Sequence, residues 1–140
     1  MYEHLLVPTD GSEGTQQAIA HGLRLADRFD ATVHGLSVVP EGPLGASEGD
    51  GVVTTARRAV DHVEDEATTT GLDVVTTVEY GIPHEVILEY CSDEGIDMVV
   101  MGTKGRTGLD RVLVGSVTER VVRMADVPVV TVRLSDEPRH

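Results

Sequence analysis

The sequence contains only one cysteine, Cys91, so no internal disulfide can form. Cys91 lies at helical spacing from Val86, Ile87 and Tyr90, and we therefore expect a small core residue rather than a reactive thiol. Long apolar runs are missing as well. No run approaches the roughly 20 residues that span a bilayer, and an apolar strand follows the N-terminus without a basic leader, so we expect a cytoplasmic protein with no membrane partner.

Positive charge is scarce too. The chain has 11 lysines and arginines against 24 aspartates and glutamates, and Lys104 is the only lysine. An acidic surface of this kind argues against nucleic acid and anionic membranes as partners. Such a surface is typical of halophilic proteins, so we expect the protein to be more stable in molar KCl than in dilute buffer.

Several catalytic signatures are absent. The sequence has no Gly-x4-Gly-Lys-Ser/Thr loop of P-loop ATPases, no Ser-Gly-Gly-x-Asp-Ser loop of pyrophosphate-releasing ligases and no His-x-Gly-His of nucleotidyltransferases. The six histidines form no metal-ligand spacing, and no Ser-His-Asp elbow is visible. His84 falls in the first turn of a predicted helix, where a surface position is expected. No general base for activating water is evident.

What the chain does contain is an alternation of short apolar runs with helical patterns. The runs are nearly continuous in Val, Ile and Leu, as expected for parallel strands that are covered on both faces. With 140 residues, the chain predicts one α/β domain with an open, doubly wound, Rossmann-like sheet of five parallel strands. Residues 40–51 hold two prolines and four glycines and predict a loop. The predicted strands are 4–7, 32–39, 72–78, 96–101 and 129–133, and the predicted helices are 12–29, a second one containing 56–67, then 83–92 and one from 116.

The segment 102–118, GTKGRTGLDRVLVGSVT, directly follows the predicted fourth strand. Gly102 and Gly105 have no Cβ, so backbone N–H groups can converge there on an anion. Ser116, with Glu119 three residues later, predicts a capping box at the start of the last helix. The free N–H groups and the dipole of that helix would favour a phosphate in the same space.

Positive charge is concentrated in this segment. Residues 102–115 carry three basic side chains and one acidic one, whereas the rest of the chain carries 8 basic and 23 acidic side chains. Lys104 could neutralise a phosphate oxygen as a point charge, and Arg106 could hold one with two hydrogen bonds. Either side chain could instead point into solvent. We interpret the contrast as an anion site rather than as a basic loop without a ligand.

The spacing Gly-x2-Gly-x9-Gly-Ser, with Gly102, Gly105, Gly115 and Ser116 as its fixed points, resembles the nucleotide-binding motif of the universal stress protein A family. The turn at residues 8–12, the Gly-Ile-Pro at 81–83 and the closing strand at 127–133 extend the resemblance over nearly the whole chain. It implies the ATP-binding subgroup, with ATP as ligand, alone or with Mg²⁺ or Mn²⁺. It also implies the strand order 3-2-1-4-5, which brings the ends of strands one and four to one crevice.

The resemblance assigns roles to individual residues. Pro8, Thr9 and Asp10 would line the base and ribose side, with Asp10 near the phosphates or their metal. The residues leave open whether Asp10 instead caps the first helix, with Glu13 completing the box. Val38 would contact adenine through its backbone. Lys104 stands where other members often have histidine. The implied nucleotide contacts are Pro8, Thr9, Asp10, Val38, Met101, Gly102, Thr103, Lys104, Gly105, Arg106, Thr107, Gly108, Gly115, Ser116, Val117 and Thr118.

These observations favour an ATP-binding regulatory or stress-response module whose 102–115 loop orders around nucleotide. The alternative is a slow Mg²⁺-dependent ATPase or an autophosphorylating enzyme in which Asp10 helps to hold the metal. A scaffold that has lost nucleotide binding is a third interpretation, which the intact motif disfavours. The apolar run 127–132 would lie at a sheet edge, and the resemblance implies a homodimer through this last strand.

Overall fold

The computed structural model describes residues 2–11, 13–40, 49–103 and 115–133. In these residues strands and helices alternate along the chain, as the sequence predicts. None of the helices in the described ranges combines the length and the apolar character that crossing a membrane requires. The elements are β1 (His4–Pro8), α1 (Glu13–Phe29), β2 (Thr32–Val39), α2 (Gly49–Thr70), β3 (Val74–Tyr80), α3 (Pro83–Glu94), β4 (Met98–Gly102), α4 (Ser116–Met124) and β5 (Val129–Val132).

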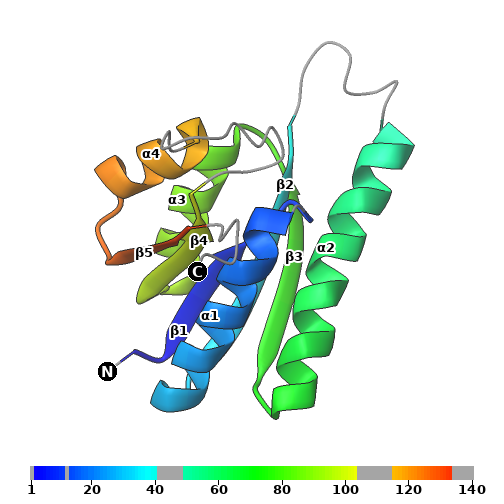
Figure 1. The fold of residues 1–140 in the computed structure, drawn as a ribbon. Coiled ribbons are helices and arrows are strands. Elements are labelled where there is room, and N and C mark those ends of the chain that lie inside the picture. Colours follow the sequence, from blue (N-terminus) through cyan, green and yellow to red (C-terminus); the bar gives the residue numbers. More distant parts are fainter. Residues whose placement is uncertain (1, 12, 41–48, 104–114, 134–140) are drawn as a thin grey trace, which may run out of the picture.

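The strands form one five-stranded sheet in the order β3-β2-β1-β4-β5. All four neighbouring pairs are parallel, which confirms the predicted fold class and strand order. Figure 1 shows α1 and α2 on one face of the sheet and α3 and α4 on the other. The sheet is therefore doubly wound, and the strand order reverses between β1 and β4.

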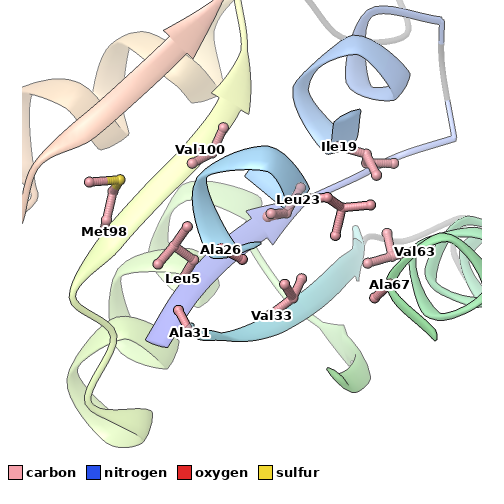
Figure 2. Close-up of a cluster of buried hydrophobic side chains, with 11 residues drawn as sticks. Leu5, Ile19, Leu23, Ala26, Ala31, Val33, Val63, Ala67, Met98 and Val100 are labelled. Atoms are coloured by element: carbon pink, nitrogen blue, oxygen red, sulfur yellow. The ribbon is translucent and has the colours of Figure 1, made fainter. Parts of the chain in front are cut away.

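The central strand β1 is buried on both faces. Its side chains alternate, so Leu5 and Val7 join the core under α1 and α2, whereas Leu6 joins the core under α3 and α4. All three side chains are fully buried. Figure 2 shows the first of these cores, with Leu23 and Ala26 of α1 lying over Leu5 and Val33 of the sheet.

Two glycines allow helices to approach the sheet closely. A Cβ on Gly22 of α1 would lie 2.9 Å from Val7 Cγ2, and one on Gly35 of β2 would lie 3.0 Å from Val63 Cγ1 of α2. Real Cβ atoms are essentially never closer than 3.0 Å to another heavy atom, so Gly22 in particular has no room for a side chain. These two contacts fix the depth at which α1 and α2 pack.

Some predicted boundaries were wrong. Residues 49–51, assigned to a loop, form the first turn of α2, while 41–48 lie outside the described residues. Strand β3 begins two residues later and ends two residues later than predicted, because it pairs with β2 as far as Val39 and Tyr80. Helix α3 continues to Glu94, where Gly95 ends it in the left-handed conformation at φ 65°.

The burial expected for Cys91 is confirmed in part. The thiol is half-buried and lies beside the core under α3 and α4 rather than inside it. Burial raises the pKa of Cys91 to about 11. Because the thiolate is the nucleophile, a raised pKa agrees with the expectation that Cys91 is not a reactive thiol.

Candidate functional site

A pocket of about 790 Å³ lies where β1, β2 and β4 end. Parallel strands present their carboxyl ends at one edge, and the reversal of strand order between β1 and β4 leaves a crevice there. Helices α2, α3 and α4 complete its walls. The lining residues are Pro8, Thr9, Asp10, Thr15, Leu36, Ser37, Val38, Val39, Pro40, Gly51, Val52, Thr55, Ala56, Pro83, Ile87, Met101, Gly102, Gly115, Ser116, Val117 and Thr118.

The turn after β1 is held in place by hydrogen bonds. The Thr9 N–H donates to the Leu36 carbonyl at 2.8 Å, which extends the pairing of β1 with β2 by one residue. The Thr9 hydroxyl donates to the Thr15 hydroxyl at 3.0 Å and accepts the Gly11 N–H at 3.2 Å. Gly11 has φ +82°, a conformation that suits glycine. This turn places Asp10 at the pocket wall.

The end of β4 and the start of α4 are joined although 13 positions of the sequence separate Gly102 from Ser116. The buried Thr118 hydroxyl donates to the Gly102 carbonyl at 2.7 Å. The Gly115 N–H donates to the Thr103 carbonyl at 2.6 Å. The first turn of α4 therefore faces the pocket beside Gly102, with its N–H groups free of intrahelical partners.

The predicted capping box at Ser116 is wrong. Gly115 is the N-cap, with φ −63° and ψ 155°, and no side chain caps the helix. Ser116 is already the first helical residue, so the Glu119 N–H donates to the Gly115 carbonyl at 3.0 Å. The Glu119 carboxylate instead pairs with Arg123 one turn further on, at 2.8 Å. Because no side chain among the described residues caps the helix start, its N–H groups can serve a ligand.

The structure brings ten of the sixteen predicted contact residues to the pocket wall. Thr103 is not among them, because its N–H and carbonyl bond to Val132 and Gly115 and join β4 to its neighbours. Residues Lys104, Gly105, Arg106, Thr107 and Gly108 lie outside the described residues. The ten are Pro8, Thr9, Asp10, Val38, Met101, Gly102, Gly115, Ser116, Val117 and Thr118.

The sequence analysis missed the walls that α2 and α3 supply. Val52 and Ala56 of α2 and Ile87 of α3 make the β2 side of the pocket apolar, together with Leu36 and Val39. Their spacing is that of ordinary core residues, so nothing in the pattern marks them as pocket residues. The Gly-Ile-Pro turn at 81–83 is the only signal, since it begins α3 at the pocket.

The described residues contain no group of three or more histidine, cysteine, aspartate or glutamate side chains that could hold a metal ion. Asp10 stands at the pocket wall without a second acidic side chain among the lining residues. A metal beside Asp10 would therefore need further ligands, which the phosphates of a bound nucleotide could supply.

The sequence also gave no sign of a buried hydrogen-bond chain beneath the pocket. His34 Nδ1 of β2 lies 2.8 Å from the Tyr90 hydroxyl of α3, and His34 Nε2 lies 3.1 Å from His4 Nδ1 of β1. A neutral imidazole has one donor and one acceptor nitrogen, so either tautomer of His34 satisfies both contacts. Two pocket residues lie close to these hydrogen bonds in the sequence, since Leu36 follows His34 by two residues and Ile87 precedes Tyr90 by three. The contact between His34 and Tyr90 therefore fixes α3 against β2 beside the pocket.

Stability should decrease as the pH falls below 6.5. Burial, and then the neighbouring His4, lower the pKa of His34 from its ordinary value of 6.5, while Glu94 opposes the shift. Below that value the unfolded chain takes up a proton that folded His34 resists, so acid favours unfolding until the lowered pKa is passed. Urea unfolding of His34→Gln between pH 7 and 5 should show a smaller pH dependence than the natural protein. If the stability of His34→Gln depends on pH as strongly as that of the natural protein, this explanation is wrong. His62→Gln serves as the control.

Comparison with known proteins agrees with this architecture. A model of the universal stress protein family matches residues 1–133. Universal stress protein MJ0531 of Methanocaldococcus jannaschii is 33% identical over 141 residues, which cover 95% of this chain and 83% of that protein. The solved structure of MJ0577 from the same organism is 31% identical with a TM-score of 0.87, and the match covers 98% of this chain and 99% of that one.

A more distant structure shows a likeness of fold alone. It is a universal stress protein family member from Arabidopsis thaliana with AMP bound, 17% identical, with a TM-score of 0.76 over 96% of this chain and 93% of that one. The family model covers nearly all of this chain, and MJ0531 exceeds 30% identity over 95% of this chain and 83% of its own length. The chain belongs to the universal stress protein family.

Proposed function

We propose that the pocket binds ATP and that the protein is a nucleotide-binding regulatory module of the stress response. The observation that carries this is the chemical difference between the two ends of the pocket. At one end, beside Gly102, the first turn of α4 offers backbone N–H groups without a side-chain cap, which suit phosphate. At the other end Leu36, Val39 and the α2 wall offer apolar surface, which suits a nucleobase.

The charge distribution supports the same assignment. ATP is strongly negative and the chain is strongly acidic, so binding needs a local source of positive potential. Residues 102–115 carry three basic side chains against one acidic side chain, and they connect the two elements that meet at the phosphate end. A related fold in the Arabidopsis thaliana protein holds AMP, which indicates that this architecture can accept an adenine nucleotide.

Titration calorimetry with ATP, ADP and AMP, in molar KCl with Mg²⁺, tests the proposal. Binding should strengthen with each added phosphate. Thr118→Val should weaken ATP binding by about tenfold, because the start of α4 loses the buried hydrogen bond that holds it beside Gly102, and such a bond is worth about 1–3 kcal/mol. The matched control is Thr70→Val, whose hydroxyl also donates to a backbone carbonyl, at 2.9 Å, but is exposed and outside the pocket.

Absence of heat with folded, nucleotide-free protein would overturn the proposal and favour a scaffold that no longer binds nucleotide. Equal affinities for ATP, ADP and AMP would contradict the proposal that the start of α4 binds the phosphates. The same samples also report on the alternative function. Phosphate release that disappears in Asp10→Ala would favour a slow ATPase.

We also propose a homodimer in which two β5 strands pair. Strand β5 has β4 as its neighbour on one side only and carries half-exposed valines. Its Pro128 and Val132 carbonyls accept hydrogen bonds at 3.0 and 3.2 Å from Val99 and Thr103, at the β4 side. In a parallel strand the N–H and carbonyl groups of successive residues point alternately to the two sides. Because Val132 points toward β4, the N–H and carbonyl groups of its neighbour Thr131 face the open edge.

Thr131→Pro should therefore convert the dimer to a monomer while the β4–β5 pairing survives, because proline removes the outward N–H. Thr131→Val retains that N–H and should remain dimeric. Light scattering at micromolar protein in molar salt gives both masses. A natural protein with the mass of one chain would rule out the dimer, and a dimeric Thr131→Pro would place the interface elsewhere.

A further inference from the structure

Ser37 is a buried polar residue that the fold does not use. It lies in β2, opposite Val78 of β3, and is 3% exposed. The other buried polar residues of the pocket wall, Thr9, Thr15 and Thr118, all have hydrogen bonds to protein groups. In the part of the chain that the structure describes, the Ser37 hydroxyl has none. Burying a hydroxyl without a partner is unfavourable, so an exception of this kind points to a partner outside the described residues, such as a ligand in the pocket.

The strand places this hydroxyl at the apolar end of the pocket. Side chains alternate along β2, so Ser37 lies on the same face as Val33 and Gly35, the face that α2 covers. Val52 and Ala56 of α2 line the pocket on that face. Ser37 therefore places a buried hydroxyl of β2 beside the aliphatic side chains of this wall. A ligand group that reaches it must be flat or apolar over most of its surface and must carry a polar edge.

The distance from the phosphate end agrees with a nucleotide that spans the pocket. Strand β1 separates β2 from β4, and neighbouring strands lie about 5 Å apart, so Ser37 is about 10 Å across the sheet from Gly102. When phosphates occupy the start of α4, the part of the molecule that extends this far is the base. The ribose and phosphates remain on the β1 and β4 side.

We propose that the Ser37 hydroxyl hydrogen-bonds the polar edge of the nucleobase and makes the pocket selective for a purine. This inference rests on the proposed nucleotide binding. A hydroxyl can donate and accept, so it can pair with a ring nitrogen or with an exocyclic amine. The single ring of a pyrimidine extends less far toward β2 and leaves the hydroxyl unpaired, which disfavours its binding. Ser37 thus stabilises the complex while contributing no hydrogen bond to the free protein.

Ser37→Ala tests this with two independent measurements. In the free protein the free energy of unfolding should be unchanged or higher, because no hydrogen bond is lost. The affinity for ATP should fall about fivefold, the effect of one buried hydrogen bond, and the affinity for UTP should fall less, so that the preference for ATP narrows. The control is Ser92→Ala, which removes an exposed hydroxyl from α3 outside the pocket and should change neither quantity.

Three results would overturn the inference. If Ser37→Ala binds ATP as tightly as the natural protein, the hydroxyl contacts water only. If the variant unfolds more easily in the absence of ligand, the residue has a structural role. If ATP and UTP lose affinity by the same factor, the contact is not with the base. A natural protein that binds no ATP would instead refute the proposed function, and the role of Ser37 with it, so the two failures are distinguished by the natural protein alone.

Discussion

Gly22→Val is expected to lower the free energy of unfolding by about 3 kcal/mol, the upper part of the range for overpacked cores. A Cβ at this position would lie 2.9 Å from Val7 Cγ2 and 3.6 Å from the Val100 side chain. Val7 and Val100 are fully buried in β1 and β4, so neither can move aside cheaply. Helix α1 would have to move away from the two strands whose ends form the pocket.

The sign of this effect is informative. Replacing glycine inside a helix ordinarily stabilises the folded state, because glycine loses the most backbone entropy on folding. Gly51→Ala in α2 is the matched control, since a Cβ there meets nothing within 4 Å, and it should be as stable as the natural protein or more stable. Urea unfolding measures both variants. Equal stability of Gly22→Val and the natural protein would show that α1 is not packed as closely as described.

Leu6→Ala is expected to lower the free energy of unfolding by about 3 to 4 kcal/mol. Leu6 is fully buried in the middle of β1, on the face covered by α3 and α4. Parallel neighbours on both sides, paired with it through His34 and Val99, hold its backbone in place and prevent the cavity from collapsing. Because small domains are stable by about 5–15 kcal/mol, this one substitution removes a large share of the total.

Leu25→Ala provides the comparison for Leu6→Ala, because Leu25 is only partly buried at the edge of the other core. Its loss of stability should be distinctly smaller. Urea unfolding well above pH 6.5, where His34 is mostly neutral in both states, keeps the histidine effect out of the measurement. Equal losses for the two leucines would mean that the Leu6 site can collapse, and that the core under α3 and α4 is loosely packed.

Much of the fold could be predicted, for reasons that individual elements make clear. The bounds of β2 were predicted correctly, because its valines and leucine form an apolar run that lies between Asp30 and Pro40. The start of α2 was not, since proline and glycine content indicates a loop while helix extension past Gly51 depends on contacts made elsewhere in the fold. Gly115 and Ser116 are both acceptable N-caps, so sequence could not decide between them. The strand order came from the family resemblance and not from periodicity.

The candidate site divides in the same way. The end that we propose for the phosphates involves one continuous segment, which begins at Gly102 and includes Gly115, so short-range spacing alone could point to it. Its apolar end combines Ser37 with residues of α2 and α3, and only the folded chain brings these together. The same is true of His34, His4 and Tyr90, which three separate elements contribute. A serine or histidine within a strand gives no sign of such partners before the fold is known.

The central place of β1 also determines when the site can exist during synthesis. When the nascent chain has emerged from the ribosome as far as β3, β1 can already pair with β2. Strand β4, the other neighbour of β1, has not yet been synthesised. The nascent chain then holds half a sheet with one open apolar edge and only part of the pocket wall. If the pocket binds ATP as we propose, the nucleotide cannot bind during these early steps and can stabilise only the finished chain. The proposed ATP binding then implies that a cell short of ATP would fold this protein as before, and that the folded protein would lose stability only afterwards.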